Sequence, residues 1–298
     1  MNEPKQLPKR YIRPVVVAGA TGSQGGAVAH RLLERGHSVR ALTRNPDKPA
    51  AQVLKQAGAD VVQTDLMNRK SLEAALVGAE ALFSVQDFLE AGVAAELEMG
   101  MNLTEAAASS NIQHLVYSGA STIDRHTGVP HLDSKWQIEQ RVRLLDIPFT
   151  ILRPAAFMDN WEWEREQIER DGSLRLPLRP DSLYRQVAVA DIAAMAVTAL
   201  EQPDMWQGQI VPLAGDVATP LTIAKTFSDV MGNPIHYEQI SWEKCLQEQG
   251  EELTAMYKYF DTYGMDGEPQ LLKRWHPEMH TLEHYLQAHH WDKASAVS

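Results

Sequence analysis

The sequence predicts an α/β protein with a Rossmann-type, doubly wound parallel sheet and a smaller, mostly helical C-terminal lobe. Three observations support this fold class. Short apolar runs alternate with longer segments of helical period over residues 14–153, a glycine-rich turn follows the first apolar run, and the alternation loosens beyond residue 153. Strands that alternate with helices form parallel sheets with helices on both faces.

The strands are predicted from short runs rich in Val, Leu and Ile, which are typical of sheets buried on both faces. They are Pro14–Gly19, Ser38–Thr43, Asp60–Thr64, Ala79–Val85, His114–Ser118 and Phe149–Arg153. The segments between them place apolar residues on one helical face, and they are Gly25–Arg35, Ser71–Val77, Ala94–Ser110 and Asp133–Leu145. Ligands of such sheets bind beyond the carboxyl ends of the strands.

Two domains are expected. Residues 14–155 form the NAD(P)-binding Rossmann domain, and segments within about 187–215 are candidates to complete its sheet. Residues 156–292 form the smaller lobe, which would bind a substrate or a partner. The last residues, Lys293–Ser298, are expected to fray.

The composition restricts the function. The chain has 298 residues, a formal net charge of −11 and one cysteine, Cys245. The acidic balance disfavours direct binding to nucleic acid, and a single cysteine allows neither an intramolecular disulfide nor a thiolate metal cluster. Residues 1–13 lack an apolar leader segment, and no apolar stretch reaches membrane-spanning length. We therefore expect a cytoplasmic protein that does not contact membranes.

The glycine-rich turn is the strongest functional signal. Gly19, Gly22 and Gly25 follow the first strand and open an amphipathic helix, with Thr21, Ser23 and Gln24 between them. In a dinucleotide-binding turn, these glycines permit the tight bend, the close approach of a pyrophosphate and the packing of helix on strand. The amide groups at the start of the helix then bind the phosphates. The sequence therefore predicts a dinucleotide site here.

The end of the second strand favours NADP(H) over NAD(H). NAD-specific sites usually carry an acid there, which binds the ribose 2′-hydroxyl group. This strand instead ends in Thr43-Arg44-Asn45, and Lys48 follows. The Arg44 guanidinium suits a 2′-phosphate, although Arg44 could also be a solvated loop residue. After the third strand, Asp65 could accept a hydrogen bond from adenine with Leu66 against the ring, or it could cap the next helix.

Several stretches together resemble the NmrA-like (HSCARG-like) branch of the atypical short-chain dehydrogenase/reductase superfamily. The resemblance spans roughly residues 14–235 and weakens beyond them. It is carried by GATGSQGG at 19–26, LTRNP at 42–46, TDLMN at 64–68, LVYSGAS at 115–121, HLDSKWQIEQ at 131–140 and PFTILRPAAFMDN at 148–160. The resemblance implies a Rossmann fold, NADP(H) binding and a variable C-terminal lobe. It also implies either reductase activity or a redox-sensing role.

The resemblance also implies roles for individual residues along the cofactor. Thr21, Gln24, Arg44 and Asp65 would line its phosphate and adenosine end. Val85 and Gln86 would face the ribose, and Lys135 would reach the nicotinamide ribose. The nicotinamide ring and amide would lie near Pro154, Ala155 and Phe157.

The chemistry-bearing positions depart from the usual reductase pattern. Reductases of this superfamily that use a Tyr-x-x-x-Lys pair need the tyrosine as proton donor, and a spacing of four puts both residues on one helix face. Here the two positions are His131 and Lys135. His131 could donate a proton or simply pack at the site, and Lys135 alone could serve as the acid. Ser118, at the end of the fifth strand, could polarise a substrate or satisfy the backbone.

Two further groups of residues could serve either a binding site or ordinary packing. His276, His280 and His284 have helical spacing, but a solvated helix face is favoured over a metal site, so no metal is predicted. Trp161 and Trp163 could wall a substrate site or anchor the smaller lobe.

Two functional classes stay open. The first is an NADPH-dependent reductase of a small carbonyl, quinone or enone. The second is a non-catalytic sensor of the NADPH/NADP+ ratio that acts through a regulatory protein partner. A homodimer is compatible with both classes.

Overall fold

The computed structural model describes residue 9 and residues 11–292, so the predicted fraying of Lys293–Ser298 lies outside the described residues. The chain forms two compact units, each built from separate segments. The first unit contains the described residues up to Ile123, together with His131–Arg153 and Ile192–Val211. The second contains Asp124–Pro130, Pro154–Asp191 and the described residues from Pro212 onward.

The first unit is built on a seven-stranded sheet with the order β10-β6-β5-β4-β1-β2-β3. The pairs β1–β2, β1–β4, β2–β3, β4–β5 and β5–β6 are all parallel. The strands are β1 (Val15–Val17), β2 (Val39–Thr43), β3 (Asp60–Gln63), β4 (Ala81–Ser84), β5 (His114–Ser118), β6 (Phe149–Pro154) and β10 (Ile210–Leu213).

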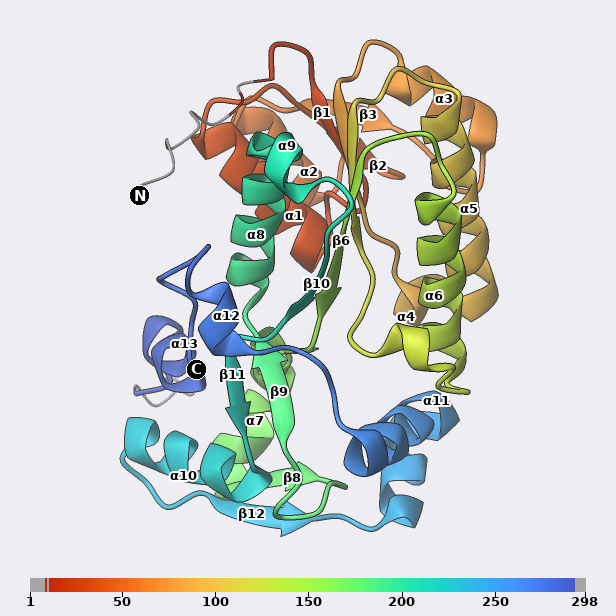
Figure 1. Cartoon of the computed structure of the whole chain (residues 1–298). Coiled ribbons are helices and arrows are strands. Elements are labelled where there is room, and N and C mark those ends of the chain that lie inside the picture. Colours follow the sequence, from red (N-terminus) through yellow and green to blue (C-terminus); the bar gives the residue numbers. More distant parts are fainter. Residues whose placement is uncertain (1–8, 10, 293–298) are drawn as a thin grey trace, which may run out of the picture. The chain divides into compact units, whose positions relative to one another are not determined.

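Helices cover both faces of this sheet, as Figure 1 shows: α1, α2 and α8 lie on one face, and α3, α5 and α6 lie on the other. Their bounds are α1 (Ser23–Glu34), α2 (Pro49–Gln56), α3 (Arg69–Leu76), α5 (Val93–Ala108), α6 (Pro130–Arg143) and α8 (Val189–Glu201), with the shorter α4 (Phe88–Ala91) and α9 (Pro203–Trp206). The predicted doubly wound α/β class is confirmed.

One apolar core lies between the sheet and the helices α3, α5 and α6. Strand residues such as Val16 and Leu82 are fully buried, and they meet Leu72, Leu103 and Ile138 from the three helices. Every residue of β1 and β4 is buried, so side chains on both faces of the sheet are covered. This explains why the two strands are continuous apolar runs without polar alternation.

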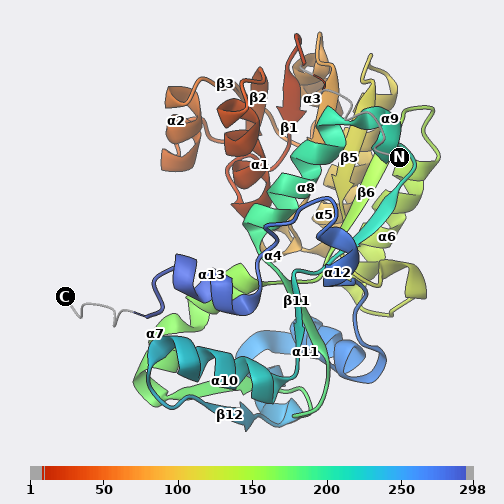
Figure 2. The same ribbon diagram turned by 60° about the vertical axis from the view of Figure 1, so that its left-hand side comes forward.

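The second unit combines small sheets with helices (Figure 2). A three-stranded sheet has the order β11-β9-β7, and a two-stranded sheet pairs β12 with β8. The strands are β7 (Ala156–Phe157), β8 (Ser173–Leu176), β9 (Tyr184–Val187), β11 (Asp216–Ala218) and β12 (His236–Gln239). The helices are α7 (Trp161–Asp171), α10 (Pro220–Met231), α11 (Trp242–Tyr263), α12 (Pro269–Leu272) and α13 (Leu282–Ala288).

The long helix α11 is interrupted at Gly250, whose φ of 79° and ψ of 176° are not helical. Cys245 lies on α11, is buried, and accepts a hydrogen bond from the Thr254 hydroxyl group (3.4 Å). No helix among the described residues combines the length and the apolar composition needed to cross a membrane.

Candidate functional site

The glycine loop joins β1 to α1, and two of its glycines are required by space. Gly19 has a φ of +63°, and an added Cβ would lie 2.9 Å from Cγ1 of Val85. At Gly25 an added Cβ would lie 2.3 Å from the carbonyl oxygen of Gly19. Gly22 is less crowded, with the Gly19 oxygen at 3.4 Å. The loop therefore folds back on itself in a way that only glycine permits.

The start of α1 offers free amide groups to an anion. Its N-cap is Gly22, which has no side chain to accept from the first turn, and the first turn contains no acidic residue. The first amide groups of a helix have no partner within the helix, and the helix dipole adds positive charge there. Thr21 is half-buried, and Ser23 is exposed at this end. These groups fit a pyrophosphate.

Ser118 connects the end of β5 to the glycine loop. Its hydroxyl group donates a hydrogen bond to Oε1 of Gln24 at 2.7 Å, and Ser118 itself is buried. Two residues predicted from separate parts of the sequence therefore meet. The contact places a hydroxyl and a carboxamide at the carboxyl edge of the sheet.

Gln86 follows β4 and carries a polar atom that lacks a partner. Its Nε2 donates to Oγ of Ser84 at 3.0 Å, while its Oε1 is buried and has no hydrogen-bond partner among the described residues. Because buried polar atoms are nearly always satisfied, this oxygen fits a ligand that donates a hydrogen bond, such as a ribose hydroxyl. Val85, next to it, packs against Gly19.

Lys135 lies on α6 in an ion pair with a buried acid. Its ammonium group contacts Oε1 of Glu96 on α5 and lies 3.4 Å from the carbonyl oxygen of Gln86. The Ser134 hydroxyl donates to the other oxygen of Glu96 at 2.6 Å. Glu96 is completely buried, whereas the Lys135 side chain is 13% exposed. Lys135 is therefore held beside the end of β4 with its charge compensated.

His131 lies one turn before Lys135 on α6 and is buried, with 3% of its surface exposed. Its ring stacks on Phe88 of α4, with centroids 4.3 Å apart and planes inclined by 10°. The position that would carry the tyrosine therefore holds a packed imidazole.

Arg44 and Lys48 follow β2 at its carboxyl end and are both exposed. Arg44 is not solvated alone, because its guanidinium pairs with Oε2 of Glu90 on α4 at 2.6 Å. Lys48 precedes α2 as its N-cap residue. Lys48 and the Glu90-paired Arg44 thus both follow β2, where a 2′-phosphate is predicted to bind.

The third-strand residues have local roles. Oδ1 of Asp65 accepts from the backbone amide of Met67 at 2.9 Å, and the cap of α3 is Asn68, which accepts from Ser71 at 3.2 Å. Asp65 is therefore not the helix cap. Leu66 is half-buried and packs against the core of the first unit.

Pro154, Ala155 and Phe157 belong to the second unit, where Phe157 lies in β7, which pairs with β9. Pro154 and Ala155 are buried, and Phe157 is half-buried. Their predicted place at the nicotinamide stays a prediction.

The histidines near the C-terminus do not share one helix. His276 and His280 precede α13 and converge on the buried Asp191, with Nε2 of His276 at 2.8 Å and Nδ1 of His280 at 2.9 Å from its Oδ1. His284 alone lies on α13. Among the residues that the structure describes, no group of three or more His, Cys, Asp or Glu side chains is arranged to hold a metal ion.

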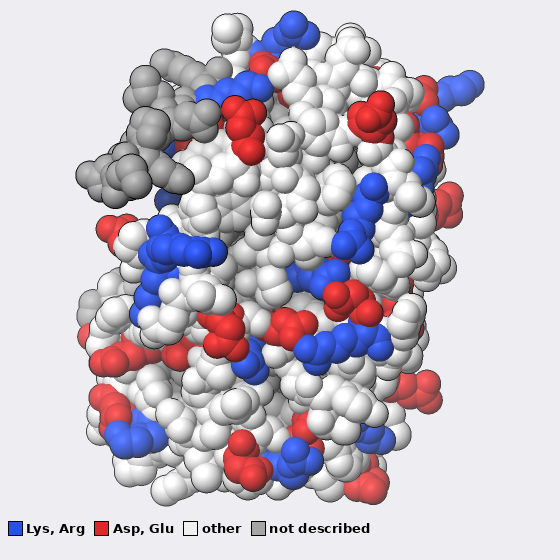
Figure 3. All heavy atoms as spheres, in the orientation of Figure 1, with Lys and Arg blue, Asp and Glu red and all other residues white. Residues whose placement is uncertain are grey.

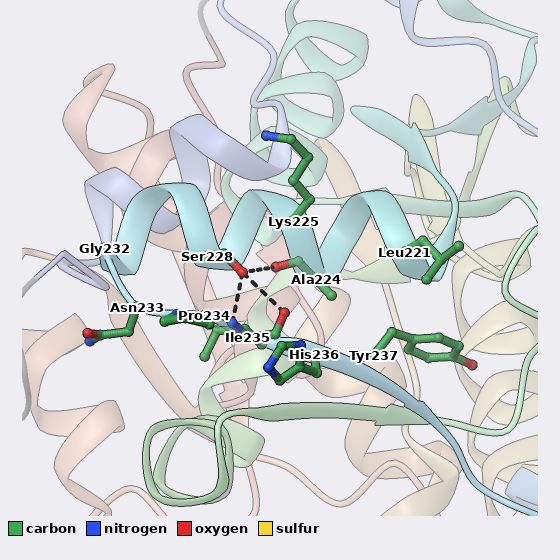
Figure 4. A pocket seen from close by; sticks show the side chains of 10 residues that line it. All are labelled: Leu221, Ala224, Lys225, Ser228, Gly232, Asn233, Pro234, Ile235, His236 and Tyr237. Atoms are coloured by element: carbon green, nitrogen blue, oxygen red, sulfur yellow. Dashed lines mark hydrogen bonds between the residues drawn. The ribbon is translucent and has the colours of Figure 1, made fainter.

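A hollow in the second unit lies between α10 and β12, and Figure 4 shows its lining. The Ser228 hydroxyl group donates to the carbonyl oxygens of Ala224 and Ile235 and accepts from the Ile235 amide. None of the residues predicted to bind a cofactor lines this hollow. Trp161 at the start of α7 is buried and donates to Gln186, whereas Trp163 is 73% exposed.

The charged surface is mixed. On the face drawn in Figure 3, Lys and Arg side chains alternate with Asp and Glu side chains, without a broad basic area. With a net charge of −11, such a face does not resemble a nucleic-acid-binding surface.

Glu90 and Glu96 were not predicted from the sequence, although each contacts a predicted residue. Glu96 is an acid on α5 at a position that the helical period places among the buried residues Met99, Gly100 and Leu103. Because charged residues are rarely buried without a partner, this position was the available signal. Glu90 sits in an exposed turn and gives no such signal.

Comparisons with known proteins place this geometry in context. The model of the NmrA-like family matches residues 13–291. An NmrA-like family domain-containing oxidoreductase, hkm9 of Aspergillus hancockii, is 37% identical over 78% of this chain and 76% of its own length.

Among solved structures, the NADPH-dependent quinone oxidoreductase QOR2 of Escherichia coli, complexed with NADPH, is similar with a TM-score of 0.81. It is 21% identical and covers 93% of this chain and 99% of its own. NmrA, a negative transcriptional regulator solved with NADP, has a TM-score of 0.76 and is 20% identical, covering 92% of this chain and 94% of its own. At these identities the structural likeness concerns the fold.

Proposed function

The chain belongs to the NmrA-like family, and from this premise we propose that it is an NADP(H)-dependent reductase of a small carbonyl, quinone or enone. The observation that carries the proposal is the hydrogen bond from Ser118 to Gln24, at 2.7 Å. It joins a hydroxyl group suited to polarise a substrate oxygen with the loop suited to hold the cofactor. The quinone oxidoreductase of similar fold supports the substrate class.

The residues proposed to hold the cofactor follow one edge of the sheet. The first turn of α1 would bind the pyrophosphate, and Arg44 with Lys48 would bind the 2′-phosphate. The unpartnered Oε1 of Gln86 would accept from a ribose hydroxyl. Lys135 would contact the nicotinamide ribose, and Pro154, Ala155 and Phe157 would lie toward the nicotinamide.

The bound cofactor supplies a hydride, and the protein supplies orientation and a proton. Of the two candidate donors, Lys135 suits the role better than His131. The Lys135 ammonium carries an exchangeable proton, is partly exposed, and is kept beside the Gln86 carbonyl by Glu96. The His131 ring is packed face to face with Phe88. Because Ser118 donates its single hydroxyl proton to Gln24 in the structure, it would donate to the oxygen that is being reduced after that bond breaks.

A sensor function is the second candidate, because one specific observation favours it. The tyrosine of the reductase pair is replaced by a buried histidine, so the usual proton donor is missing. A transcriptional regulator shares the fold. In this alternative, the chain binds NADP(H) without turnover and presents the bound state to a protein partner.

The deciding experiment measures NADPH oxidation with a panel of quinones, aldehydes and enones. Wild type is compared with Lys135→Ala and with a control, Lys55→Ala, which removes an exposed lysine from α2. We expect turnover to fall by roughly 100-fold or more in Lys135→Ala, as is typical when a proton donor is lost. The Lys55 variant should retain full activity.

Binding of NADPH and NADH is titrated on the same samples. If NADPH oxidation by wild type is lost in Lys135→Ala while NADPH binding survives, the reductase is supported. Tight NADPH binding without turnover on any acceptor would favour the sensor instead. Absence of NADPH binding would contradict both candidates.

A further inference from the structure

We propose that Glu90 is a cofactor-selectivity residue, whose carboxylate competes with the 2′-phosphate of NADP(H) for Arg44 and so weakens the preference for NADP(H) over NAD(H). The inference rests on the proposed function, because it requires a dinucleotide on the glycine loop. It adds a residue outside the end of β2 to those that decide between NADP(H) and NAD(H).

The strand order indicates that the Arg44–Glu90 ion pair crosses the carboxyl end of β1, where the glycine loop begins. Arg44 follows β2, and Glu90 lies on α4, which follows β4. In the sheet order, β1 lies between these two strands. Neighbouring strands are about 4.8 Å apart, so β2 and β4 are roughly 10 Å apart and the joined side chains pass over the end of β1. The glycine loop begins at that same end.

Through this ion pair, Glu90 places a carboxylate beside Arg44, although the sequence at the end of β2 contains no acid. The sequence Thr43-Arg44-Asn45 ends β2 without a carboxylate, which favours a 2′-phosphate. Glu90 brings a carboxylate to the Arg44 guanidinium at 2.6 Å. The main cation of the predicted 2′-phosphate site is therefore already paired with a carboxylate.

The charge state of Glu90 strengthens the competition. The Arg44 guanidinium lowers the pKa of the Glu90 carboxyl group, and Lys48 adds to this effect. Glu90 is therefore ionised at neutral pH and repels an incoming phosphate dianion. NAD(H) carries a hydroxyl group at this position and escapes the repulsion. Both side chains are more than half exposed, so the effect is modest and sensitive to salt.

The exposed end of α4 allows the Glu90 side chain to move. The helix α4 is a single turn that begins after Asp87, whose side chain accepts from Leu89, and ends at Gly92 with a φ of +84°. Glu90, Leu89 and Ala91 are exposed. Because the Glu90 side chain is mostly exposed, it can rotate away from Arg44 when phosphate binds, while Phe88 keeps α4 stacked on His131. The cost of breaking the ion pair falls on NADP(H) and not on NAD(H).

The test compares dissociation constants of NADPH and NADH for wild type, Glu90→Gln and Glu98→Gln. Glu98 is an exposed acid on the adjacent helix α5, so its variant controls for the loss of one negative charge. We expect Glu90→Gln to bind NADPH about two- to fivefold more tightly, the range for an exposed charge pair. NADH binding should change by less than about twofold. Glu98→Gln should match wild type.

Two further measurements separate electrostatics from a change in the shape of α4. In an Arg44→Ala background, Glu90→Gln should improve NADPH binding clearly less than in wild type, because the competed cation is gone and only the direct repulsion between Glu90 and the phosphate remains. The gain should also shrink between about 0.05 M and about 0.5 M salt. If the gain in NADPH binding came only from a changed shape of α4, it would persist unchanged in the Arg44→Ala background and at high salt.

The outcomes distinguish this inference from the proposed function. If wild type binds NADPH but Glu90→Gln leaves the NADPH-to-NADH ratio unchanged, the selectivity role is wrong and the proposed function stands. An equal gain for both dinucleotides, or a gain in NADPH binding that is undiminished in the Arg44→Ala background, also overturns the role. If no variant binds either dinucleotide, the proposed function fails and the inference fails with it.

Discussion

Gly25 is the least replaceable residue of the glycine loop, because an added Cβ would lie 2.3 Å from a backbone oxygen that cannot move aside. We expect Gly25→Ala to lower the free energy of unfolding by about 1–3 kcal/mol, as overpacking does, and to abolish NADPH binding. Urea unfolding and cofactor titration measure the two effects. Gly26→Ala is the control, since its nearest contact would be 3.3 Å. Equal effects in both variants would contradict this account.

Because Glu96 is buried more deeply than Lys135, we expect replacement of Lys135 to destabilise the fold more than replacement of Glu96. Lys135→Met leaves the fully buried Glu96 carboxylate without its cation, whereas Glu96→Gln leaves a partly exposed ammonium that water can reach. We expect the first to cost about 3–5 kcal/mol of unfolding free energy and the second clearly less. The double variant should regain part of the loss. Urea unfolding tests this, and equal costs would show that the pair is not buried in solution.

His114 predicts a pH dependence of stability. Burial lowers its pKa to about 4, with the charge of Lys9 adding to the effect, and Nε2 lies 2.9 Å from Oγ1 of Thr150. The neutral form is therefore favoured in the fold. This stability is present above the unfolded pKa of about 6.5 and is lost as pH falls toward 4, by at most roughly 3 kcal/mol.

The measurement is the unfolding free energy of wild type and His114→Asn as a function of pH. The variant should show a flatter profile between about pH 6.5 and about pH 4. His236→Asn, which removes an exposed histidine, should keep the wild-type slope. Parallel profiles for wild type and His114→Asn would refute the assignment.

The candidate residues in the recognised motifs were named from the sequence, but the acidic residues that pair with two of them were not. Ser118, Gln24 and Lys135 were identified from the sequence, and the first two are in contact. Glu96 and Glu90 contact Lys135 and Arg44 from helices far away in the sequence. Which helix faces which strand depends on tertiary packing, so single-sequence patterns do not specify these pairs.

At the scale of elements, the segment before α13 is tied to the start of α8 through Asp191. The backbone amide of His280 donates to Oδ2 of Asp191 at 2.8 Å, and its imidazole contacts Oδ1. The hydrogen bond to Asp191 raises the pKa of His280. A raised folded pKa stabilises at low pH, and the contribution is lost as pH rises through that pKa.

We therefore expect residues 276–281 to open more readily at about pH 8 than at about pH 6. Hydrogen exchange of these amides, corrected for intrinsic rates, measures the opening. His280→Asn should remove the dependence, and His284→Asn, at an exposed position on α13, should preserve it. Exchange that is independent of pH in wild type would contradict the role of the pair.

Helices and strands with a clear hydrophobic pattern were predicted to within a few residues, whereas several short elements were missed. The predicted helix Ala94–Ser110 corresponds to α5 (Val93–Ala108), and the predicted strand His114–Ser118 has the bounds of β5. The eight-residue α2 and the strands β7, β8, β11 and β12 were missed. Such strands are two to four residues long and exist through their pairing partners, so they carry little periodic signal of their own.

For the whole molecule, a bound cofactor should stabilise the first unit. The proposed phosphate, ribose and lysine contacts all lie in that unit. At NADPH concentrations about 100 times its dissociation constant, we expect a gain of about 2.7 kcal/mol. Hydrogen exchange with and without NADPH should show the strongest protection in the glycine loop and the ends of β2 and β4. Protection confined to residues 212–292 would place the cofactor elsewhere.

The interleaved segments of the two units have a consequence for synthesis on the ribosome. The first unit needs Ile192–Val211 for part of α8 and for β10, yet Pro154–Asp191 of the second unit leaves the ribosome before it. At about 5–20 residues per second, several seconds pass between β6 and β10. During that interval β6 is an unpaired sheet edge, which is a place where nascent chains associate wrongly.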